Sequence, residues 1–443
     1  MKKILSIILA LTMVVTVFSA SAIGVSADTT APAPFVTVDH VDYMLEKSNG
    51  QYFYSAMTFF DSIDYALVAT EINIASEIDG VPVTSIRKLV TDGETIPSVP
   101  DVKKSNSTNF FERYYQNISI KGHGITGLGQ NVTKINIPDS IKEIGWFAFK
   151  GFSKLKALDI PDGVESIGYG AFEGCKSLKS ITLPSKVTYI PTNAFKDCQS
   201  LSAVDIKGDV KIISSNAFLN CKSLKSINLP ENLKWIGSRA FQNTGLTSIT
   251  IPATVTRVGY GEDSYAAAFK NCRNLTKVVF KTSSDANRVL EIGLGAFKGC
   301  TKLEEVYFPK KGKKLSIDPI AFLGCTSLNK IANYSYFDSV KIFTSAFENC
   351  TSLKKFILTD NIATLDSKAF NGCNNLSKIY VKTASKSVSN VFSKDTFKGT
   401  KTGLCFITYD TTTAKRMKTA INSTGVKNAK IYVKSKLVYK NVK

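Results

Sequence analysis

Apolar residues recur along most of the chain in one fixed order, and the copy from Ala171 to Pro184 shows it clearly: Ala-Phe-Glu-Gly-Cys-Lys-Ser-Leu-Lys-Ser-Ile-Thr-Leu-Pro. At its end, apolar and polar residues alternate in Ile181-Thr182-Leu183. This alternation predicts a short strand with Ile181 and Leu183 facing inward and Thr182 facing outward. Pro184 has no backbone N–H to give to a neighbouring strand, so it is expected to end the strand.

The copies follow one another at a nearly constant interval, 23 residues four times in succession and 23 to 28 residues later. A fixed period of this length indicates a repeat architecture, in which each unit buries its apolar face against its neighbours. A second run, Val187-Thr188-Tyr189-Ile190, supplies two more inward residues before the next Ala-Phe pair. We therefore predict a β-rich solenoid of right-handed coils with short strands, single helical or 3₁₀ turns and terminal caps. The phenylalanines that head the clear copies are Phe149, Phe172, Phe195, Phe218, Phe241, Phe269, Phe297, Phe322, Phe347 and Phe370, with a degenerate copy at Phe397.

This order of residues resembles the BspA-type leucine-rich repeats of secreted and surface-attached bacterial proteins, whose consensus runs Ala-Phe-x-x-Cys-x-x-Leu-x-x-Ile-x-Leu-Pro. The resemblance covers roughly residues 70 to 400. Phe152 and Thr244 replace the Cys, and Asn333 and Tyr334 stand where Leu and Pro are expected. The resemblance implies a leucine-rich-repeat solenoid that acts as an adhesin or a binding module.

The first 27 residues have the three parts of a secretory signal peptide: Lys2 and Lys3, an apolar run, and a site of small residues. Cleavage is expected after Ala27, with Ala22 as the alternative. No later stretch approaches the length of a membrane span. We therefore expect a secreted or cell-surface protein without a membrane span in its mature form, and a monomer.

The boundaries of the remaining segments are predicted from where the sequence departs from the repeat. Two strand-like runs, Phe35–Tyr43 and Tyr52–Phe60, flank Asn49-Gly50, and Asn-Gly between such runs is a strong hairpin signal. A surface loop is expected from residue 87 to 117, and a helix from Ala414 to Ile421. The predicted segments are 1–27, the signal peptide; 28–70, an N-terminal β cap; 71–131, first irregular coils with a long insertion; 132–400, the solenoid; and 401–443, a C-terminal cap.

Eight of the nine cysteines occupy the same place in the repeat. Equivalent places stack into a column, and free Cys packs as a small apolar side chain. Because Phe152 and Thr244 take the same place, we predict that the position requires packing, and that the thiols are buried and unpaired. The eight are Cys175, Cys198, Cys221, Cys272, Cys300, Cys325, Cys350 and Cys373.

Metal binding, cofactors and catalysis are not expected. The chain has no Cys-x-x-Cys, and His40 and His123 are its only histidines, so zinc ligands and a base for a nucleophile are lacking among the clear repeats. The sequence leaves open a glycoside hydrolase that uses a pair of carboxylates. Residues 122–127 match Gly-x-Gly-x-x-Gly, but Val132–Ile137 after them reads as a strand where the dinucleotide fingerprint needs a helix. We interpret these glycines as turns between coils.

The chain is basic, with 56 Lys plus Arg against 36 Asp plus Glu and a formal net charge of +20. Such an excess favours anionic partners such as acidic polysaccharide, wall polymer or an acidic protein. Nucleic acid is not expected, because export removes the opportunity. The alternative is that the charge only confers solubility.

The outward strand position changes character along the repeats. It holds small or polar residues in the first five clear coils and mostly apolar or aromatic residues in the last five, while the position two residues earlier becomes mostly Lys. Equivalent residues lie about 4.8 Å apart across a sheet, so two adjoining stripes are predicted, with the ingredients of a binding surface. The alternative is that Lys281–Asn287 and Lys310–Lys314 fold over the stripes. The candidate ligand-binding residues are Lys277, Tyr307, Lys330, Lys355, Ile357, Lys378 and Tyr380.

Two functions are compatible with this pattern. The first is a secreted leucine-rich-repeat binding or adhesion protein that uses the exposed sheet face to capture an anionic extracellular protein or acidic glycan. The alternative is a structural cell-envelope protein held to anionic wall polymer by its net positive charge. A chemically distinct patch on the sheet favours the first, and uniform basic charge favours the second.

Overall fold

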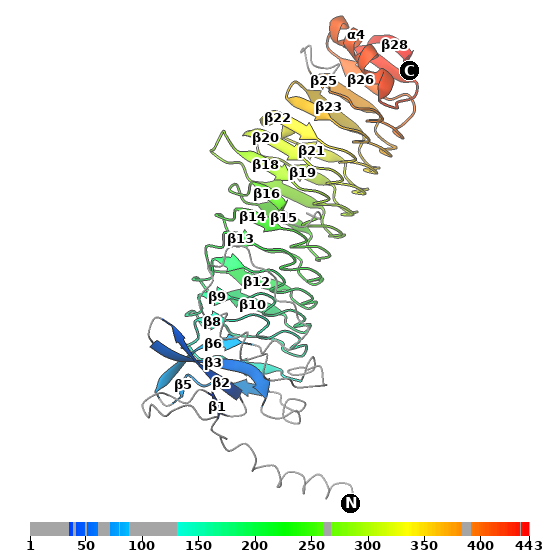
Figure 1. Cartoon of the computed structure of the whole chain (residues 1–443). Helices are drawn as coiled ribbons and strands as arrows, with labels where there is room; N and C mark the ends of the chain where they lie inside the picture. Colours follow the sequence, from blue (N-terminus) through cyan, green and yellow to red (C-terminus); the bar gives the residue numbers. More distant parts are fainter. Residues whose placement is uncertain are drawn as a thin grey trace, which may run out of the picture. The chain divides into compact units, whose positions relative to one another are not determined.

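The computed structural model describes residues 35–38, 41–48, 51–60, 71–78, 80–87, 131–260, 267–382, 391–434 and 436–442. Over these residues the chain winds into a β-solenoid of about 11 turns with almost no helix (Figure 1). Most coils contribute one strand to each of two parallel ladders. The predicted solenoid is therefore confirmed.

The first ladder consists of the strands at the Ile-x-Leu end of the repeat. In β10, Ile181 and Leu183 are buried and Thr182 is exposed, as the alternation predicts. β10 pairs in parallel with β12, which places Ile181 beside Val204. Pairing along this ladder is interrupted after β7, β12 and β21, so that its strands belong to four sheets. They are β4 (Glu71–Asn73), β7 (Lys134–Asn136), β10 (Ser180–Leu183), β12 (Ala203–Ile206), β15 (Ser248–Ile251), β17 (Lys277–Phe280), β19 (Glu305–Tyr307), β21 (Lys330–Ala332), β23 (Lys355–Thr359), β25 (Lys378–Lys382), β26 (Cys405–Thr408) and β27 (Ala429–Val433).

The second ladder is built from shorter strands in the other half of each coil. Tyr189 and Ile190 pair in parallel with Ile212 and Ile213 of the next coil. The side chains of Ile190 and Ile213 are buried. β5 (Glu77–Ile78) adds to this ladder by pairing antiparallel with β6. The strands of the ladder are β6 (Val81–Arg87), β8 (Glu143–Ile144), β9 (Ser166–Ile167), β11 (Tyr189–Ile190), β13 (Ile212–Ile213), β14 (Trp235–Gly237), β16 (Arg257–Tyr260), β18 (Val289–Ile292), β20 (Gly312–Ile317), β22 (Phe337–Ile342) and β24 (Ile362–Leu365).

The N-terminal hairpin extends the second ladder. β2 (Val41–Ser48) and β3 (Gln51–Phe60) pair antiparallel on either side of Asn49-Gly50, which confirms the hairpin, and β3 pairs in parallel with β6. The single strand predicted from Phe35 to Tyr43 is wrong. β1 (Phe35–Val38) pairs antiparallel with β2 through a two-residue connection, so the chain reverses there. Outside the described residues lie the signal peptide at 1–27, His40, the rest of the loop predicted after Arg87, and the 122–127 motif with His123.

The C-terminal segment closes the interior of the last coils. α4 (Thr411–Ala420) confirms the predicted helix and begins where the Asp410 carboxylate accepts the N–H of Thr413 at 2.7 Å. Its buried Ala414 and Met417 belong to the same apolar cluster as the strand residues of the core. The described residues also include two short 3₁₀ segments, η1 (Tyr334–Tyr336) and η3 (Ile421–Ser423). β28 (Lys436–Val442) pairs antiparallel with β27 at the edge of the sheet.

The Ala-Phe segments form turns whose hydrogen bonds run between coils. The N–H of Phe172 donates to the carbonyl of Ala194 in the next coil at 2.9 Å, so the backbone does not continue into a helix. Two residues of most such turns adopt positive φ, for example Asn193 at 59° and Asp197 at 62°. Asn, Asp and Gly tolerate this conformation best, which explains why they are frequent there. Other N–H groups of the same segment donate three residues back: that of Lys196 to the Asn193 carbonyl at 3.1 Å and that of Cys198 to the Phe195 carbonyl at 3.2 Å. The segments are therefore single turns with the hydrogen-bond pattern of a 3₁₀ turn, as expected.

The phenylalanines stack in one continuous column inside the coils. The ring of Phe195 lies parallel to those of Phe172 and Phe218, with centroid separations of 5.1 Å and 5.3 Å. These distances are slightly wider than the strand spacing of about 4.8 Å, so one ring per coil fills the interior. The eleven phenylalanines of this column, one in each copy of the repeat from Phe149 to Phe397, are all buried.

The cysteines form a second column that hydrogen bonds as well as packs. The Cys198 thiol donates to the carbonyl of Phe172 in the preceding coil at 3.1 Å. Thr244 keeps a donor in this position, since its hydroxyl donates to the Phe241 carbonyl at 2.9 Å. Where the position holds Cys or Thr, the side chain therefore donates a hydrogen bond in addition to the packing predicted from the sequence, whereas Phe152 fills the same position without a donor. The same bond to the preceding coil is made by Cys175, Cys221, Cys272, Cys300, Cys325, Cys350 and Cys373.

The nine cysteines are free, which confirms the prediction of unpaired thiols, and all but Cys405 are buried. Burial raises the pKa of Cys175 and of Cys373 to about 12. Because the thiolate is the reactive form, iodoacetamide at about pH 8 should modify Cys405 alone in the native protein and all nine thiols after denaturation without reductant. Mass spectrometry of the alkylated protein measures both numbers.

The Cys405→Ser variant is the matched control, and its native protein should take up almost no label. Rapid labelling of several thiols in the native wild-type protein would contradict the buried column. Fewer than nine labels after denaturation would contradict the absence of disulfides. Unfolded thiols ionise near the unperturbed pKa of 9.0 while buried ones stay protonated, so the free energy of unfolding should also fall as the pH rises above about 9.

Candidate functional site

The predicted site residues lie on the outward face of the first ladder. In β25, Ile379 and Val381 are buried, whereas Lys378 is exposed and Tyr380 is half-buried. The same alternation holds in β17, β19 and β23. Strand register aligns Lys277 with Glu305 and Lys330, aligns Val279 with Tyr307 and Ala332, and pairs Lys355 with Lys378 and Ile357 with Tyr380.

The first group of site residues surrounds Tyr307. The ammonium of Lys330 lies 4.7 Å from the centre of the Tyr307 ring and that of Lys277 lies 5.1 Å from it. Lys330 also donates to the Tyr307 hydroxyl at 2.5 Å. Glu305 lies between the two lysines, with N–O distances of 3.7 Å to Lys277 and 3.4 Å to Lys330. The two lysines therefore already have partners within the chain.

The charges in this group stabilise one another. Partial burial works to raise the pKa of Glu305, but hydrogen bonds from Tyr307 and Lys330, with the charges of Lys330 and Lys277, hold that pKa below its usual value. The hydrogen bond to Tyr307 raises the pKa of Lys330. A ligand that binds here must compete with Glu305 for the lysines and with the lysines for the tyrosine ring. The side chains around Tyr307 are therefore less available to a ligand than the sequence indicates.

Strand pairing is interrupted between the two groups of site residues. β21 ends at Ala332 and does not pair with β23, because Asn333 adopts positive φ (71°) and the chain turns into η1. The side chain of Tyr334 takes over the connection. Its hydroxyl donates to the Ile357 carbonyl at 2.6 Å and accepts the Ile357 N–H at 3.1 Å. One phenol thus replaces a strand-to-strand contact, and the strands from β15 to β21 form one section of the outward face while those from β23 to β27 form another.

The second group, on β23 and β25, keeps its lysines unpaired. Among the residues that the structure describes, Lys355 and Lys378 have no carboxylate within ion-pair distance. They lie beside each other in the ladder, next to the half-buried pair Ile357 and Tyr380. Two like charges held side by side without a counter-charge attract an anion more strongly than a paired lysine does. This group is the stronger candidate for a ligand site.

The structure extends this group by residues that the sequence analysis assigned only to a cap. β26 and β27 continue the ladder in parallel, so that Ile407 and then Tyr432 follow Tyr380 in register, and Lys430 lies in the lysine column. Ile407, Tyr432 and Lys430 are all partly exposed. The sequence signal that could have identified these strands is the alternation of inward and outward residues in Cys405–Thr408 and Ala429–Val433. This alternation continues after the repeat consensus has ended.

The insertions proposed to cover the stripes lie elsewhere. Most of Lys310–Lys314 is part of β20 or leads directly into it, and Gly312 and Lys314 pair within the second ladder. The segment from Lys281 is held at the corner of the coil, where the Arg288 guanidinium donates to the Lys281 and Val255 carbonyls at 2.8 Å and 2.9 Å. Tyr307 and Tyr380 remain partly exposed.

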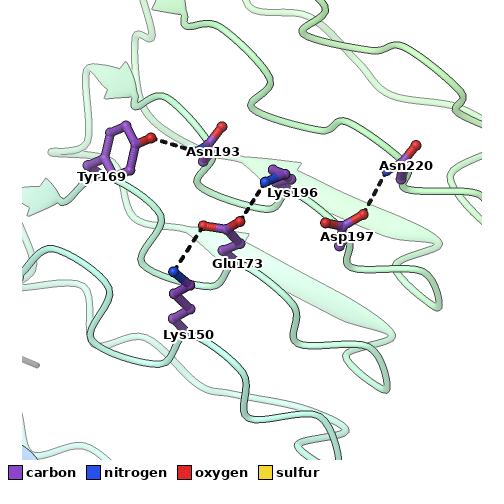
Figure 2. A network of polar contacts seen from close by, with 7 residues as sticks. All are labelled: Lys150, Tyr169, Glu173, Asn193, Lys196, Asp197 and Asn220. Carbon is purple, nitrogen blue, oxygen red and sulfur yellow. Dashed lines mark hydrogen bonds and ion pairs between the residues drawn. The ribbon is translucent and has the colours of Figure 1, made fainter. Parts of the chain in front are cut away.

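A separate polar network lies along the turns of the early coils (Figure 2). Glu173 bridges Lys196 at 2.7 Å and Lys150 at 3.9 Å, and each partner belongs to a neighbouring coil. Asn193 donates to the Tyr169 hydroxyl at 2.7 Å, and Asn220 donates to Asp197 at the same distance. The pairs of Glu173 and of Asp197 join equivalent positions in successive coils, and Asn193 lies one residue past the equivalent of Tyr169, so the repeat itself supplies the partners. We interpret this network as stabilising the stacking of successive coils.

The described part of the chain contains no group of three or more His, Cys, Asp or Glu side chains placed to hold a metal ion. None of its helices is long and apolar enough to cross a membrane.

A family model described as "BspA type Leucine rich repeat region" matches the chain in six copies, over residues 128–218, 191–326 and 262–402. These matches together cover more than half of the sequence. No curated protein matches the chain significantly.

Three solved structures illustrate the likeness of fold. A leucine-rich repeat protein from Bacteroides ovatus is 22% identical, with 89% of this chain and 99% of that chain covered and a TM-score of 0.48. A leucine-rich cell surface protein from Faecalibacterium prausnitzii is 23% identical, with coverages of 91% and 96% and a TM-score of 0.44. The pneumococcal vaccine antigen PcpA is 21% identical, with coverages of 90% and 98% and a TM-score of 0.49.

The Tyr334 hydroxyl is predicted to hold the two sections of the outward face together. Tyr334→Phe removes it and leaves the N–H and carbonyl of Ile357 without this partner, which should lower the free energy of unfolding by about 1–3 kcal/mol. Urea denaturation measures the loss, and hydrogen exchange at the Ile357 amide should become faster. Tyr336→Phe is the control, because the Tyr336 side chain is 56% exposed. Identical unfolding midpoints for the wild type and Tyr334→Phe would contradict the bridging role.

Proposed function

Because this chain belongs to the BspA-type leucine-rich repeat family, we propose that it is a secreted or cell-surface binding protein that captures an anionic extracellular partner. The outward face of β23 and β25 is the proposed capture surface. One observation carries the proposal: Lys355 and Lys378 lie side by side without a carboxylate partner among the described residues, next to Ile357 and Tyr380.

The composition of this face suits an anionic partner for two physical reasons. Neighbouring ammonium groups recruit negative charge, and the attraction is lost gradually as salt screens it. Half-buried Ile357 and Tyr380 add apolar area and an aromatic ring beside the lysines, which gives short-range contact that charge alone does not supply. The combination of long-range attraction and short-range contact is what distinguishes a binding surface from a merely soluble one.

Binding without catalysis is typical of this repeat family, and the proposal assigns no reaction to the chain. Export through residues 1–27 remains a prediction from the sequence, and so does the monomeric state. Within this reading the solenoid is a scaffold. Its interior holds the coils in register, and the outward positions of the late coils present the lysines and apolar side chains.

The second candidate function is a structural role in the cell envelope, in which diffuse positive charge holds the protein to anionic wall polymer. The observation in its favour is that the early coils also expose lysines, among them Lys156, Lys179 and Lys225. These lysines stand beside small or polar outward residues such as Thr182 and Asn228. The two functions therefore differ in whether the position of the lysines matters.

Substitution of the paired lysines should separate the two functions. Lys355→Ser with Lys378→Ser is expected to lower the affinity for immobilised polyglucuronate or polyglutamate about tenfold, if each lysine contributes about 0.7 kcal/mol. The salt dependence of binding should become shallower. Lys330→Ser should have a smaller effect, because Glu305 already pairs with Lys330. Biolayer interferometry over a range of salt concentrations measures both quantities.

The matched control is Lys156→Ser with Lys179→Ser, which removes the same amount of charge from exposed positions in the early coils. This variant should retain most of the affinity. Equal losses for the two double variants would mean that only the diffuse charge matters. That result would reject the capture surface and favour the envelope function.

A further inference from the structure

We propose that the partner is an acidic polysaccharide whose chain lies across the strands of the C-terminal sheet, with sugar rings stacked on Tyr380 and Tyr432. This inference rests on the proposed function and specifies its ligand. The site comprises the outward faces of β23, β25, β26 and β27, half of which lie beyond the repeats that the sequence pattern marks.

The central row of this surface is apolar and regular. Strand register places Ile357, Tyr380, Ile407 and Tyr432 next to one another in that order. All four side chains are partly exposed, while the residues that alternate with them are mostly buried. Neighbouring strands are about 4.8 Å apart, so the two tyrosines are separated by about 10 Å along the row. Two aromatic rings at this separation match the repeat of a polymer better than a single small ligand.

Lysines flank the central row on both sides. Lys378 and Lys382 lie two residues before and two residues after Tyr380 on the outward face of β25, about 7 Å away along the strand. Lys355 and Lys430 continue the first side, and exposed Lys434 stands at the end of β27 on the other. No acidic residue occupies an outward position in β23, β25, β26 or β27. The positive charge therefore follows the row without interruption by a carboxylate.

The backbone geometry disfavours the usual ways of binding a peptide. The four strands pair with one another, β28 pairs with β27 at one edge, and at the other edge the Tyr334 hydroxyl already takes the N–H and carbonyl of Ile357 in β23. Both edges are therefore partly occupied, which disfavours the addition of a peptide as a further strand. Recognition must come from side chains that repeat at the strand spacing. A polysaccharide with a carboxylate or sulfate on alternating sugars offers an apolar ring face to each tyrosine and an anion to each lysine column.

The decisive experiment compares three probes on the full mature chain: a hyaluronan decasaccharide, which alternates glucuronate with N-acetylglucosamine; polyglutamate of similar charge; and a neutral chitin oligosaccharide. Tyr380→Ala and Tyr432→Ala should each weaken hyaluronan binding about tenfold, the effect usual for an aromatic anchor. Tyr380→Phe and Tyr432→Phe should bind nearly as well as the wild type, because they keep the ring. Calorimetry measures the affinities.

Tyr189→Ala is the control, because Tyr189 is 40% exposed on the second ladder, away from the proposed row. It should bind hyaluronan as the wild type does, and polyglutamate should bind all tyrosine variants alike. Wild-type affinity of Tyr380→Ala and Tyr432→Ala for hyaluronan would overturn the inference. Polyglutamate binding tighter than hyaluronan binding, dependent on Lys355 and Lys378, would also overturn it but keep the proposed function with an acidic protein as partner. Failure to bind either polyanion would reject both.

Discussion

One phenylalanine ring per coil, stacked on the rings above and below it, determines the spacing and alignment of the whole solenoid. Phe218 contacts Phe195 and Phe241 at centroid separations of 5.3 Å and 5.2 Å, so each ring is shared by two interfaces. Removal of such a buried ring costs about 3–5 kcal/mol, a large fraction of the stability of an ordinary domain. In most coils the carbonyl of this phenylalanine also accepts a hydrogen bond from the thiol of the next coil, as Phe195 does from Cys221. Side-chain packing and backbone pairing therefore impose the same register.

This interior constraint leaves the outward positions free to differ from coil to coil. Thr182 and Tyr380 occupy equivalent outward positions, yet both lie above buried strand neighbours of the same kind. A change from threonine to tyrosine on this face costs the core nothing, because the side chain points away from it. The parallel register then converts single substitutions into rows about 4.8 Å apart. A row of surface side chains long enough to contact a polymer can therefore form, although the repeat consensus specifies only the buried positions.

The sequence was sufficient for features that depend on local periodicity. Alternation predicted that Ile181 is buried and Tyr380 faces outward, and the common repeat position of the cysteines predicted a buried column of free thiols. Contacts between side chains of different coils could not be predicted from the sequence. The pairing of Glu305 with Lys277 and Lys330 depends on long side chains that meet across strands. The interruption at Asn333 depends on a backbone turn that the Tyr334 hydroxyl then bridges. Tyr432 joins the outward row only because β27 pairs in register after the consensus has ended.

The central claim is that an anionic ligand binds at one place on this solenoid, over the last strands of the first ladder. Lysine footprinting tests it most directly: the protein is acetylated briefly with and without a saturating polyuronate, and the rate at each lysine is measured by mass spectrometry. The account predicts protection of Lys355, Lys378, Lys382 and Lys430 and unchanged rates at Lys156, Lys179 and Lys225. Uniform protection of both sets would contradict it.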